Sequence, residues 1–299
     1  MEENKTNINW YPGHMAKTRR QISEDLKLID VVIELLDARI PVSSQNPDIA
    51  GMTNGKKRIV LLNKADLADK LETKKWIEFF EKKGIPCLDV DSNSGRGVDK
   101  VNRVIESLMK DEIEKKRARG IINKTIRVMI LGIPNVGKSS FINRVSKKTS
   151  MVVGNKPGVT RQKQWIRLGS NIELLDTPGV LWPKFEEEIG LNLAYTGSIK
   201  DDIFDRVEIA YSFTKYMINN YFDRLIDRYG LDESSVKSVL SDERFMENER
   251  IYEVMKMIGK RRGAIVSGGE VDDEKVSRII LDDFRSGKFG EITLEKVVI

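Results

Sequence analysis

Short apolar runs alternate with amphipathic stretches through the first three fifths of the chain. The runs that indicate buried strands cover residues 29–36, 57–62, 85–90, 127–131, 164–168 and 171–175. Between them, apolar residues recur every three or four positions, the period of a helix that packs on one face, in residues 16–28, 70–83, 98–116 and 140–145. The stretch after Pro41, which includes Pro47 and Gly51, is predicted as a loop. This alternation predicts an α/β fold with a mostly parallel sheet flanked by helices.

Only helical patterns follow Pro183. Apolar residues step by three and four through residues 203–225, and Gly230 has the position of a C-cap. Shorter amphipathic helices are expected around residues 234–240, 249–258 and 274–285. We therefore predict two domains, residues 1–182 and residues 183–299, of which the second is smaller and all helical.

Composition places the chain among soluble globular proteins. Its 299 residues are 40% hydrophobic and 32% charged, and no apolar run reaches the ~18 residues of a membrane helix. The first residues lack a signal-peptide pattern. The single cysteine, Cys87, cannot form an intramolecular disulfide or a Cys-based metal site, and it is interpreted as a small core residue. We expect a cytoplasmic protein with no membrane partner.

A glycine-rich loop follows the apolar run 127–131 and leads into a helical pattern. Its sequence, Gly-Ile-Pro-Asn-Val-Gly-Lys-Ser at residues 132–139, is a P-loop between a strand and a helix. Backbone N–H groups of such a loop wrap an anion, and the helix N-terminus adds positive potential. Lys138 would reach the terminal phosphates, and the hydroxyl of Ser139 would bind Mg²⁺. The predicted phosphate-binding residues are Gly132, Pro134, Asn135, Val136, Gly137, Lys138, Ser139 and Ser140.

The strand predicted at residues 57–62 runs directly into Asn63-Lys64-Ala65-Asp66. The carboxylate of Asp66 can accept hydrogen bonds from both N1–H and the 2-amino group of guanine. The amide of Asn63 would address the other edge of the base, and the stem of Lys64 would pack on its face. Adenine offers no such donor pair and would leave the carboxylate unpaired. Beside a P-loop, this pattern predicts GTP and GDP as ligands.

A second loop, residues 91–97, stands where a GTPase usually carries a Ser-Ala-Lys-like segment that backs the base through main-chain contacts. Asp91 and Ser92 replace the usual Ser and Ala. Because backbone groups do much of that work, we predict that Asp91, Ser92 and Asn93 back the base.

Two further segments match the switches of a GTPase. Residues 154–161 form a loop rich in Gly and Pro, in which the Thr160 hydroxyl would complete Mg²⁺ coordination when a γ-phosphate is present. The predicted strand 171–175 ends in Asp176-Thr177-Pro178-Gly179. Asp176 would hold Mg²⁺ through water, and the N–H of Gly179 would sense the γ-phosphate. The predicted magnesium ligands are thus Ser139, Thr160 and Asp176.

These motifs stand in a permuted order, because the base-recognition motifs precede the P-loop and the Asp-Thr-Pro-Gly segment comes last. The chain resembles the circularly permuted GTPases, and most closely the ribosome biogenesis GTPase A (YlqF/RbgA) family. Besides the motifs above, the resemblance rests on Trp-Tyr-Pro-Gly-His-Met at residues 10–15, Asp-Ala-Arg-Ile-Pro at 37–41 and Ser-Gly-Gly-Glu-Val-Asp at 267–272. It implies GTP hydrolysis during late maturation of the large (50S) ribosomal subunit, with release after hydrolysis.

The residue that orients the attacking water is left open by the sequence. Val180 follows Asp-Thr-Pro-Gly, and valine cannot polarise water. One candidate is His14, the only histidine, which lies in a segment that the family treats as part of its signature. A second is a K⁺ ion held by Asn135, as the resemblance implies, and a third is a group supplied by the ribosome. We predict slow intrinsic turnover and name His14, Lys138, Thr160 and Gly179 as catalytic candidates.

The charge distribution bears on the partner. Residues 1–182 carry 33 Lys and Arg against 22 Asp and Glu, and residues 183–299 carry 18 against 24. A basic first part suits a polyanion, and Lys260, Arg261 and Arg262 form a basic cluster in the second. We expect a monomer that binds the large ribosomal subunit and rRNA, and no DNA. The alternative is a nucleotide-dependent protein-binding switch without an RNA partner.

Overall fold

The computed structural model describes residues 14–121, 124–146, 165–168, 171–182 and 185–297, without the side chains of residues 14–16. These residues fall into two compact units. One comprises the described residues up to 185 together with 293–297, and the other comprises residues 186–292. The C-terminal stretch 293–297 therefore belongs with the first unit. The predicted boundary after residue 182 stays a prediction.

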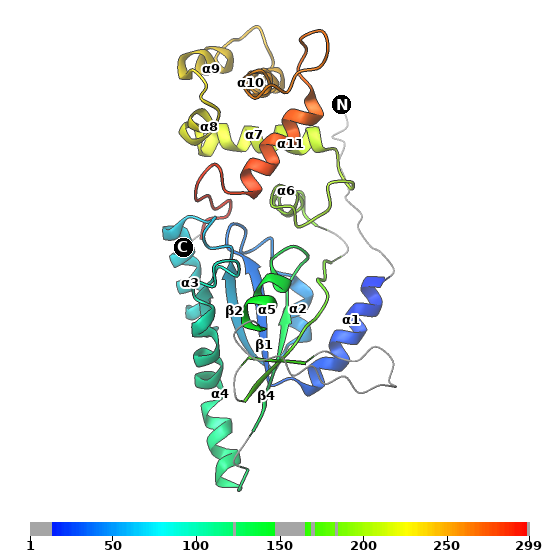
Figure 1. The fold of residues 1–299 in the computed structure, drawn as a ribbon, viewed down its shortest axis with the longest axis vertical. Helices are drawn as coiled ribbons and strands as arrows, with labels where there is room; N and C mark the ends of the chain where they lie inside the picture. The colour runs from blue at the N-terminus through cyan, green and yellow to red at the C-terminus, as the bar shows by residue number, and fades with distance from the viewer. Residues whose placement is uncertain (1–13, 122–123, 147–164, 169–170, 183–184, 298–299) are drawn as a thin grey trace. The chain divides into compact units, whose positions relative to one another are not determined.

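Within its described residues, the first unit is built on a six-stranded sheet in the order β3-β2-β1-β4-β6-β5. Figure 1 labels β2, β1 and β4 of this sheet. The strands are β1 (Val31–Asp37), β2 (Lys57–Asn63), β3 (Cys87–Asp89), β4 (Ile126–Leu131), β5 (Trp165–Arg167) and β6 (Ile172–Leu175). Four of the five pairings are parallel, and only β5 pairs antiparallel with β6. The prediction of a mostly parallel sheet is confirmed.

Helical segments precede and connect the strands of this unit. They are α1 (His14–Asp25), η1 (Leu26–Leu28), α2 (Pro47–Met52), α3 (Lys70–Lys82), η2 (Val98–Lys100), α4 (Val101–Ala118) and α5 (Lys138–Ser146). The prediction of a loop around Pro47 was wrong, because α2 begins there. The Oδ1 atom of Asn46 accepts the N–H of Asp48, and Pro47 occupies the first helical position, where a missing N–H costs nothing.

The core of the first unit lies along β1, which is buried over its whole length. Helix α3 packs Trp76 and Phe80 against side chains of β1 and β2, and Cys87 joins this cluster. Burial raises the pKa of the Cys87 thiol, so it stays protonated and inert. Cys87 is thus the small core residue that its apolar neighbours in the sequence predicted.

The second unit is helical throughout its described residues. Its helices are α6 (Glu187–Tyr195), α7 (Arg206–Asn220), α8 (Phe222–Tyr229), α9 (Glu233–Leu240), α10 (Glu247–Arg261) and α11 (Asp273–Arg285). The pattern over residues 203–225 is broken at Tyr221, which has φ −143° and ψ 42°, and Gly230 then ends α8 with φ +60° as expected. Phe213 and Phe284 pack with ring centroids 4.7 Å apart at the centre of this unit.

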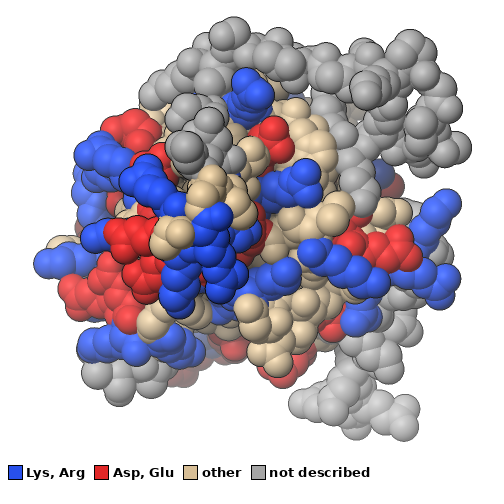
Figure 2. All heavy atoms as spheres, turned by 90° about the horizontal axis from the view of Figure 1, so that it is seen from below, with Lys and Arg blue, Asp and Glu red and all other residues tan. Residues whose placement is uncertain are grey.

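Acidic and basic side chains are intermixed on the molecular surface. On the face shown in Figure 2, Lys and Arg side chains are spread among Asp and Glu side chains. Some cations of the second unit stabilise it internally. The guanidinium of Arg285 pairs with Asp201 and donates to the carbonyl oxygens of Ala194 and Tyr195. No helix in the described part of the chain combines the length and the apolar character that crossing a membrane requires.

Candidate functional site

The motif residues gather at the carboxyl edge of the sheet because three parallel neighbours end there. Asp37 at the end of β1 stands opposite Asn63 at the end of β2, and β4 delivers the P-loop immediately after Leu131. Ligands of open parallel sheets bind in crevices at this edge. The motifs therefore meet in space although their order along the chain is permuted.

Two glycines of the P-loop lie so close to neighbouring atoms that no larger residue would fit in their place. A Cβ on Gly132 would lie 2.6 Å from the carbonyl oxygen of Leu35, and one on Gly137 would lie 2.2 Å from Nδ2 of Asn63. Gly137 also has φ +102°, and Asn135 has φ +56°, a left-handed conformation that Asn tolerates better than most residues. Asn135 therefore helps to shape the loop, and its predicted role in holding K⁺ stays a prediction.

A pocket of about 590 Å³ lies over the loop, within the size range of small-ligand sites. It is lined by Pro134, Asn135, Gly137, Lys138, Ser139, Ser140, Asp176, Thr177, Pro178 and Gly179. Six of the eight predicted phosphate-binding residues are thus among its lining residues. Gly132 and Val136 are buried and are not among them, so their contact with a phosphate stays a prediction.

Lys138 is the buried cation of the pocket. Its Nζ atom donates to the carbonyl oxygens of Gly132 at 2.9 Å and Ile133 at 2.7 Å. Burial lowers the pKa of Lys138 to about 8, while the carboxylate of Asp176 acts in the opposite direction. An anion in the pocket would stabilise the ammonium form, because the protonated lysine would gain a partner in a low-dielectric site.

The segment after β6 forms the opposite wall. The hydroxyl of Thr177 donates to the carbonyl oxygen of Ile130 on β4, which fixes the start of the segment. A Cβ on Gly179 would lie 2.8 Å from the backbone nitrogen of Pro134 and 2.9 Å from Nζ of Lys138. Only glycine allows so close an approach to the P-loop. Burial raises the pKa of Asp176, and the charge of Lys138 opposes the shift.

The donor set of this pocket fits a magnesium nucleotide. The Ser139 hydroxyl and the Asp176 carboxylate offer the hard oxygen ligands that Mg²⁺ prefers, and both residues line the same pocket as the Lys138 ammonium. The glycines of the loop carry no side chain that could cover the backbone N–H groups with which such loops bind phosphate. These residues could hold the phosphates and the ion of GTP or GDP.

Asn63 connects the P-loop to the base-recognition loops. Its side chain is 2% exposed. The Nδ2 atom donates to the carbonyl oxygen of Val136 at 2.7 Å, and Oδ1 accepts the backbone N–H of Ser92 at 3.0 Å and its hydroxyl at 2.7 Å. Both ends of this amide thus bind protein. A direct contact of Asn63 with the base stays a prediction.

Asp66 and Asp91 lie close enough to influence each other's charge. Burial and the charge of Asp91 raise the pKa of Asp66, while Arg96 and Arg39 lower it. Burial also raises the pKa of Asp91, but hydrogen bonds from Ser94 and Asn93 outweigh it and leave a net lowering. Asp66 is exposed and free to meet a ligand, whereas Asp91 and Asn93 are tied to each other by a 2.8 Å bond that shapes the loop.

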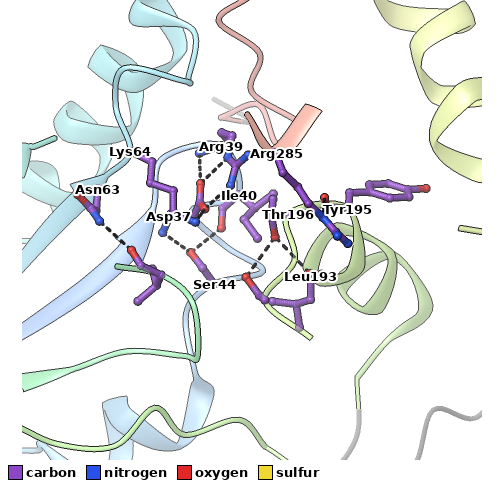
Figure 3. A network of polar contacts seen from close by, with 12 residues as sticks. Asp37, Arg39, Ile40, Ser44, Asn63, Lys64, Leu193, Tyr195, Thr196 and Arg285 are labelled. Atoms are coloured by element: carbon purple, nitrogen blue, oxygen red, sulfur yellow. Dashed lines mark hydrogen bonds and ion pairs between the residues drawn. The ribbon is translucent and has the colours of Figure 1, made fainter. Parts of the chain in front are cut away.

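A buried ion cluster, which the site prediction did not include, holds Lys64 in place (Figure 3). Asp37 is fully buried and accepts Nε and Nη2 of Arg39 at 2.9 and 2.7 Å, and Nζ of Lys64 lies 3.0 Å from it. Burial by itself would raise the pKa of Asp37, but Arg39 and Lys64 hold it well below its usual range. Lys64 has φ +57°, and this ion pair keeps its stem beside the base-recognition loop.

The structure does not describe the side chains of two predicted site residues. Thr160 belongs to the segment 147–164, and the structure describes the backbone of His14 only as the first residue of α1. Their predicted roles stay predictions.

Comparison with known proteins agrees with this geometry. A family model described as "50S ribosome-binding GTPase" matches residues 127–253. The chain is 46% identical over 290 residues to ribosome biogenesis GTPase A of Bacillus licheniformis, covering 97% of this chain and 98% of that protein. Ribosome biogenesis GTPase A of Thermotoga maritima is 31% identical over 290 residues, covering 97% and 94%.

A solved structure shows the same architecture. The crystal structure of GNP-bound YlqF from T. maritima superposes with a TM-score of 0.62 at 26% sequence identity, covering 94% of this chain and 98% of that one. With its permuted motifs assembled on one sheet edge and full-length relatives at this identity, the chain belongs to the ribosome biogenesis GTPase A (YlqF/RbgA) family of circularly permuted GTPases.

Proposed function

We propose that this protein binds GTP and GDP with Mg²⁺ and hydrolyses GTP. The observation that carries the proposal is the bridge made by Asn63, which ties the P-loop at Val136 to the base-recognition loop at Ser92. A phosphate-binding pocket and a guanine-recognition motif thereby form one continuous site. Lys138 neutralises the terminal phosphates, Ser139, Thr160 and Asp176 hold Mg²⁺, and Gly179 contacts the γ-phosphate.

We propose that intrinsic hydrolysis is slow. Val180 is apolar and only 5% exposed, so it cannot orient a water molecule in the way that a glutamine does. The missing group is His14, a K⁺ ion held by Asn135, or a group of the ribosome. These three sources can be told apart, because each makes the rate of GTP hydrolysis depend on a different factor: the identity of residue 14, the monovalent cation, or the ribosomal partner.

We propose that this GTPase acts on the large ribosomal subunit as its macromolecular partner. The relatives are named ribosome biogenesis GTPases, and the matched family model is named for 50S binding. In this proposal the protein acts late in assembly of the subunit, contacts rRNA through residues 183–299, and leaves after hydrolysis. The exposed side chains of Lys260, Arg261 and Arg262 support an RNA contact.

The deciding experiment measures GTP hydrolysis by the purified protein in K⁺ and in Na⁺, with and without large ribosomal subunits. Strong stimulation by the subunit supports the ribosomal role. Hydrolysis without stimulation in either salt supports the alternative, a nucleotide-dependent switch with a protein partner and no RNA.

Two variants then separate the sources of the catalytic group. If His14 orients the water, His14→Ala lowers kcat in both salts, with and without subunits. If Asn135 holds K⁺, Asn135→Ala removes the difference between K⁺ and Na⁺ while His14→Ala preserves it. Unchanged rates in both variants leave the ribosome as the source.

A further inference from the structure

The loop between β1 and α2, residues 40–46, is held rigid by its own hydrogen bonds. The hydroxyl of Ser44 donates to the carbonyl oxygen of Ile40 at 2.6 Å and accepts the N–H of Asp37 at 3.0 Å (Figure 3). The N–H of Ser44 also donates to Ile40, and the N–H of Gln45 donates to Val42. These bonds connect the start of the loop to its end, so we expect a displacement of one end to be passed to the other.

At one end, this loop holds the segment that follows the γ-phosphate sensor. Nδ2 of Asn46 donates to the carbonyl oxygen of Val180 at 3.0 Å, while the N–H of Val180 donates to Gly132 of the P-loop at 3.3 Å. Asn46 is 1% exposed. Because Val180 is bonded covalently to Gly179, Asn46 fixes the peptide adjoining the predicted phosphate contact.

At the other end, the loop is held by the C-terminal stretch. The carboxylate of Glu295 accepts the N–H groups of Val42 at 2.5 Å and Ser43 at 2.9 Å, and also the hydroxyl of Ser43. Leu294 donates its N–H to the carbonyl oxygen of Arg39 at 2.9 Å. Leu294 and Glu295 thus form hydrogen bonds at the start of this loop, and Asn46 lies at its end.

The C-terminal stretch is anchored a second time, on α3. The indole of Trp76 donates to the carbonyl oxygen of Glu295 at 3.0 Å, and the hydroxyl of Thr293 accepts the N–H of Asp69, the N-cap of α3. Asp69 follows the Asn-Lys-x-Asp motif by three residues. Residues 293–297 therefore touch both the loop 40–46 and the helix that leaves the base-recognition motif.

We propose that Asn46 and Glu295 are positioning residues for the GTPase site, and that together they couple the C-terminal stretch to Gly179. Contacts run without a gap from Glu295 to Val42 and Ser43, through the rigid loop to Asn46, and on to Val180. Since residues 293–297 follow directly on the helical unit along the chain, that unit is linked to the nucleotide site by these hydrogen bonds as well as by the segment after Gly179. The kinetic part of this inference rests on the proposed GTPase function.

The variant Asn46→Asp isolates the positioning role from the structural one. Aspartate still accepts the N–H of Asp48, so α2 keeps its cap. It has no hydrogen to donate, and its carboxylate repels the carbonyl oxygen of Val180. Glu295→Ala removes the grip on Val42 and Ser43, and Lys296→Ala, which removes the adjacent exposed side chain, is the matched control.

Hydrogen exchange on the full chain without nucleotide tests the coupling independently of catalysis. Both Asn46→Asp and Glu295→Ala are expected to speed amide exchange in residues 178–182, whereas Lys296→Ala leaves it unchanged. Faster exchange confined to residues 40–46 in Glu295→Ala would overturn the coupling, whether or not the protein hydrolyses GTP.

Nucleotide binding and turnover then test the positioning. Asn46→Asp is expected to lower kcat and the affinity for GTP by at least about fivefold, because the loss of one hydrogen bond accounts for roughly that factor and the repulsion of Val180 adds to it. The affinity for GDP should stay unchanged, because GDP has no γ-phosphate to contact Gly179. Equal losses for GTP and GDP, or no loss for either, would contradict this role. A wild-type protein that neither binds nor hydrolyses GTP would refute the proposed function instead, while leaving the exchange result valid.

Discussion

At the scale of single residues, the site depends on side chains whose polar atoms are fully engaged by protein. Asn63 donates from its amide nitrogen to the P-loop at Val136 and accepts with its oxygen from Ser92 in the loop 91–97. The fully buried carboxylate of Asp37 pairs with Arg39 and Lys64. With these contacts made inside the protein, Asp66 is left as the exposed carboxylate of the motif. Specificity for the base should therefore reside in Asp66.

Replacing Asp66 with asparagine tests this assignment. The carboxylate accepts two hydrogen bonds from guanine, whereas an amide accepts one and donates one, which matches the 2-oxo group of xanthine. We expect Asp66→Asn to lose affinity for GTP by about a hundredfold or more, since a polar mismatch that the bound base covers discriminates strongly. Affinity for xanthosine triphosphate should rise. Calorimetric titration with GTP and with xanthosine triphosphate measures this change in specificity. A similar loss of affinity for both nucleotides would show that Asp66 supports the loop instead.

The buried pair of Asp37 and Arg39 predicts a pH-dependent stability. In the wild type the folded pKa of Asp37 lies below its unfolded value near 4, so its contribution is complete above pH ~4 and is lost as the pH falls further. Arg39→Met leaves a buried carboxylate with Lys64 alone, which should cost about 3–5 kcal/mol at pH 7. In that variant, burial raises the pKa of Asp37, so protonation relieves the deficit as the pH falls.

Urea unfolding at pH 7 and at pH 4.5 measures this deficit. We expect a larger difference between the wild type and Arg39→Met at pH 7 than at pH 4.5. The double variant Asp37→Asn with Arg39→Met is the matched control, because it removes the buried charge, and it should lose less stability than Arg39→Met alone. A deficit independent of pH would mean that the arginine contributes by packing only.

At the scale of elements, local patterns in the sequence predicted most of the fold and the nucleotide motifs. Each strand is marked by a run of consecutive apolar residues, and the P-loop by a motif of eight consecutive residues. These local patterns were enough to locate them in the sequence. Asn46 followed by Pro47 also carries a helix-start signal, but the Gly51 nearby weakened it and α2 was missed. The contacts of Glu295 with Val42 and Ser43 span about 250 residues along the chain, and no local pattern marks them. Long-range polar contacts of this kind become visible only when the fold has placed their partners together.

Two glycines inside helices predict opposite effects of the same substitution. In α2, a Cβ on Gly51 would meet nothing within 4 Å, so Gly51→Ala should stabilise by about 0.5–1 kcal/mol through lower backbone entropy of the unfolded chain. In α10, a Cβ on Gly259 would lie 2.4 Å from Cγ1 of Val271, a stiff β-branched side chain fixed by the bridge between Ile265 and Val271.

Thermal unfolding of the two variants compares these effects. Gly259→Ala should destabilise the helical unit by about 1–3 kcal/mol, because the overpacked side chain must move the segment that carries Val271. Gly51→Ala, made in the same background, serves as the control for helix propensity. An equal gain in stability in both variants would show that residues 265–271 can move to make room for the new methyl group without loss of stability.

At the scale of the whole molecule, the distribution of charge determines how the protein would bind a polyanion. The helical unit has a net negative charge, yet its cations differ in availability. Arg285 is committed to Asp201, and Lys288 to Asp283, inside that unit. Lys260, Arg261 and Arg262 are exposed at the end of α10, where they can reach phosphates. Clustering, rather than net charge, should therefore set the affinity for rRNA.

Replacing Lys260, Arg261 and Arg262 together with alanine tests this inference through the salt dependence of binding. Each phosphate contact contributes roughly 0.9 to the slope of log K against log salt concentration, so the slope should fall by about 2–3 and the affinity at low salt should fall with it. Replacing Lys74, Lys82 and Lys83 of the first unit removes the same charge from another exposed surface. If both triple variants lower the slope equally, binding follows total charge. If only the cluster at the end of α10 matters, the helical unit carries the RNA contact despite its net negative charge.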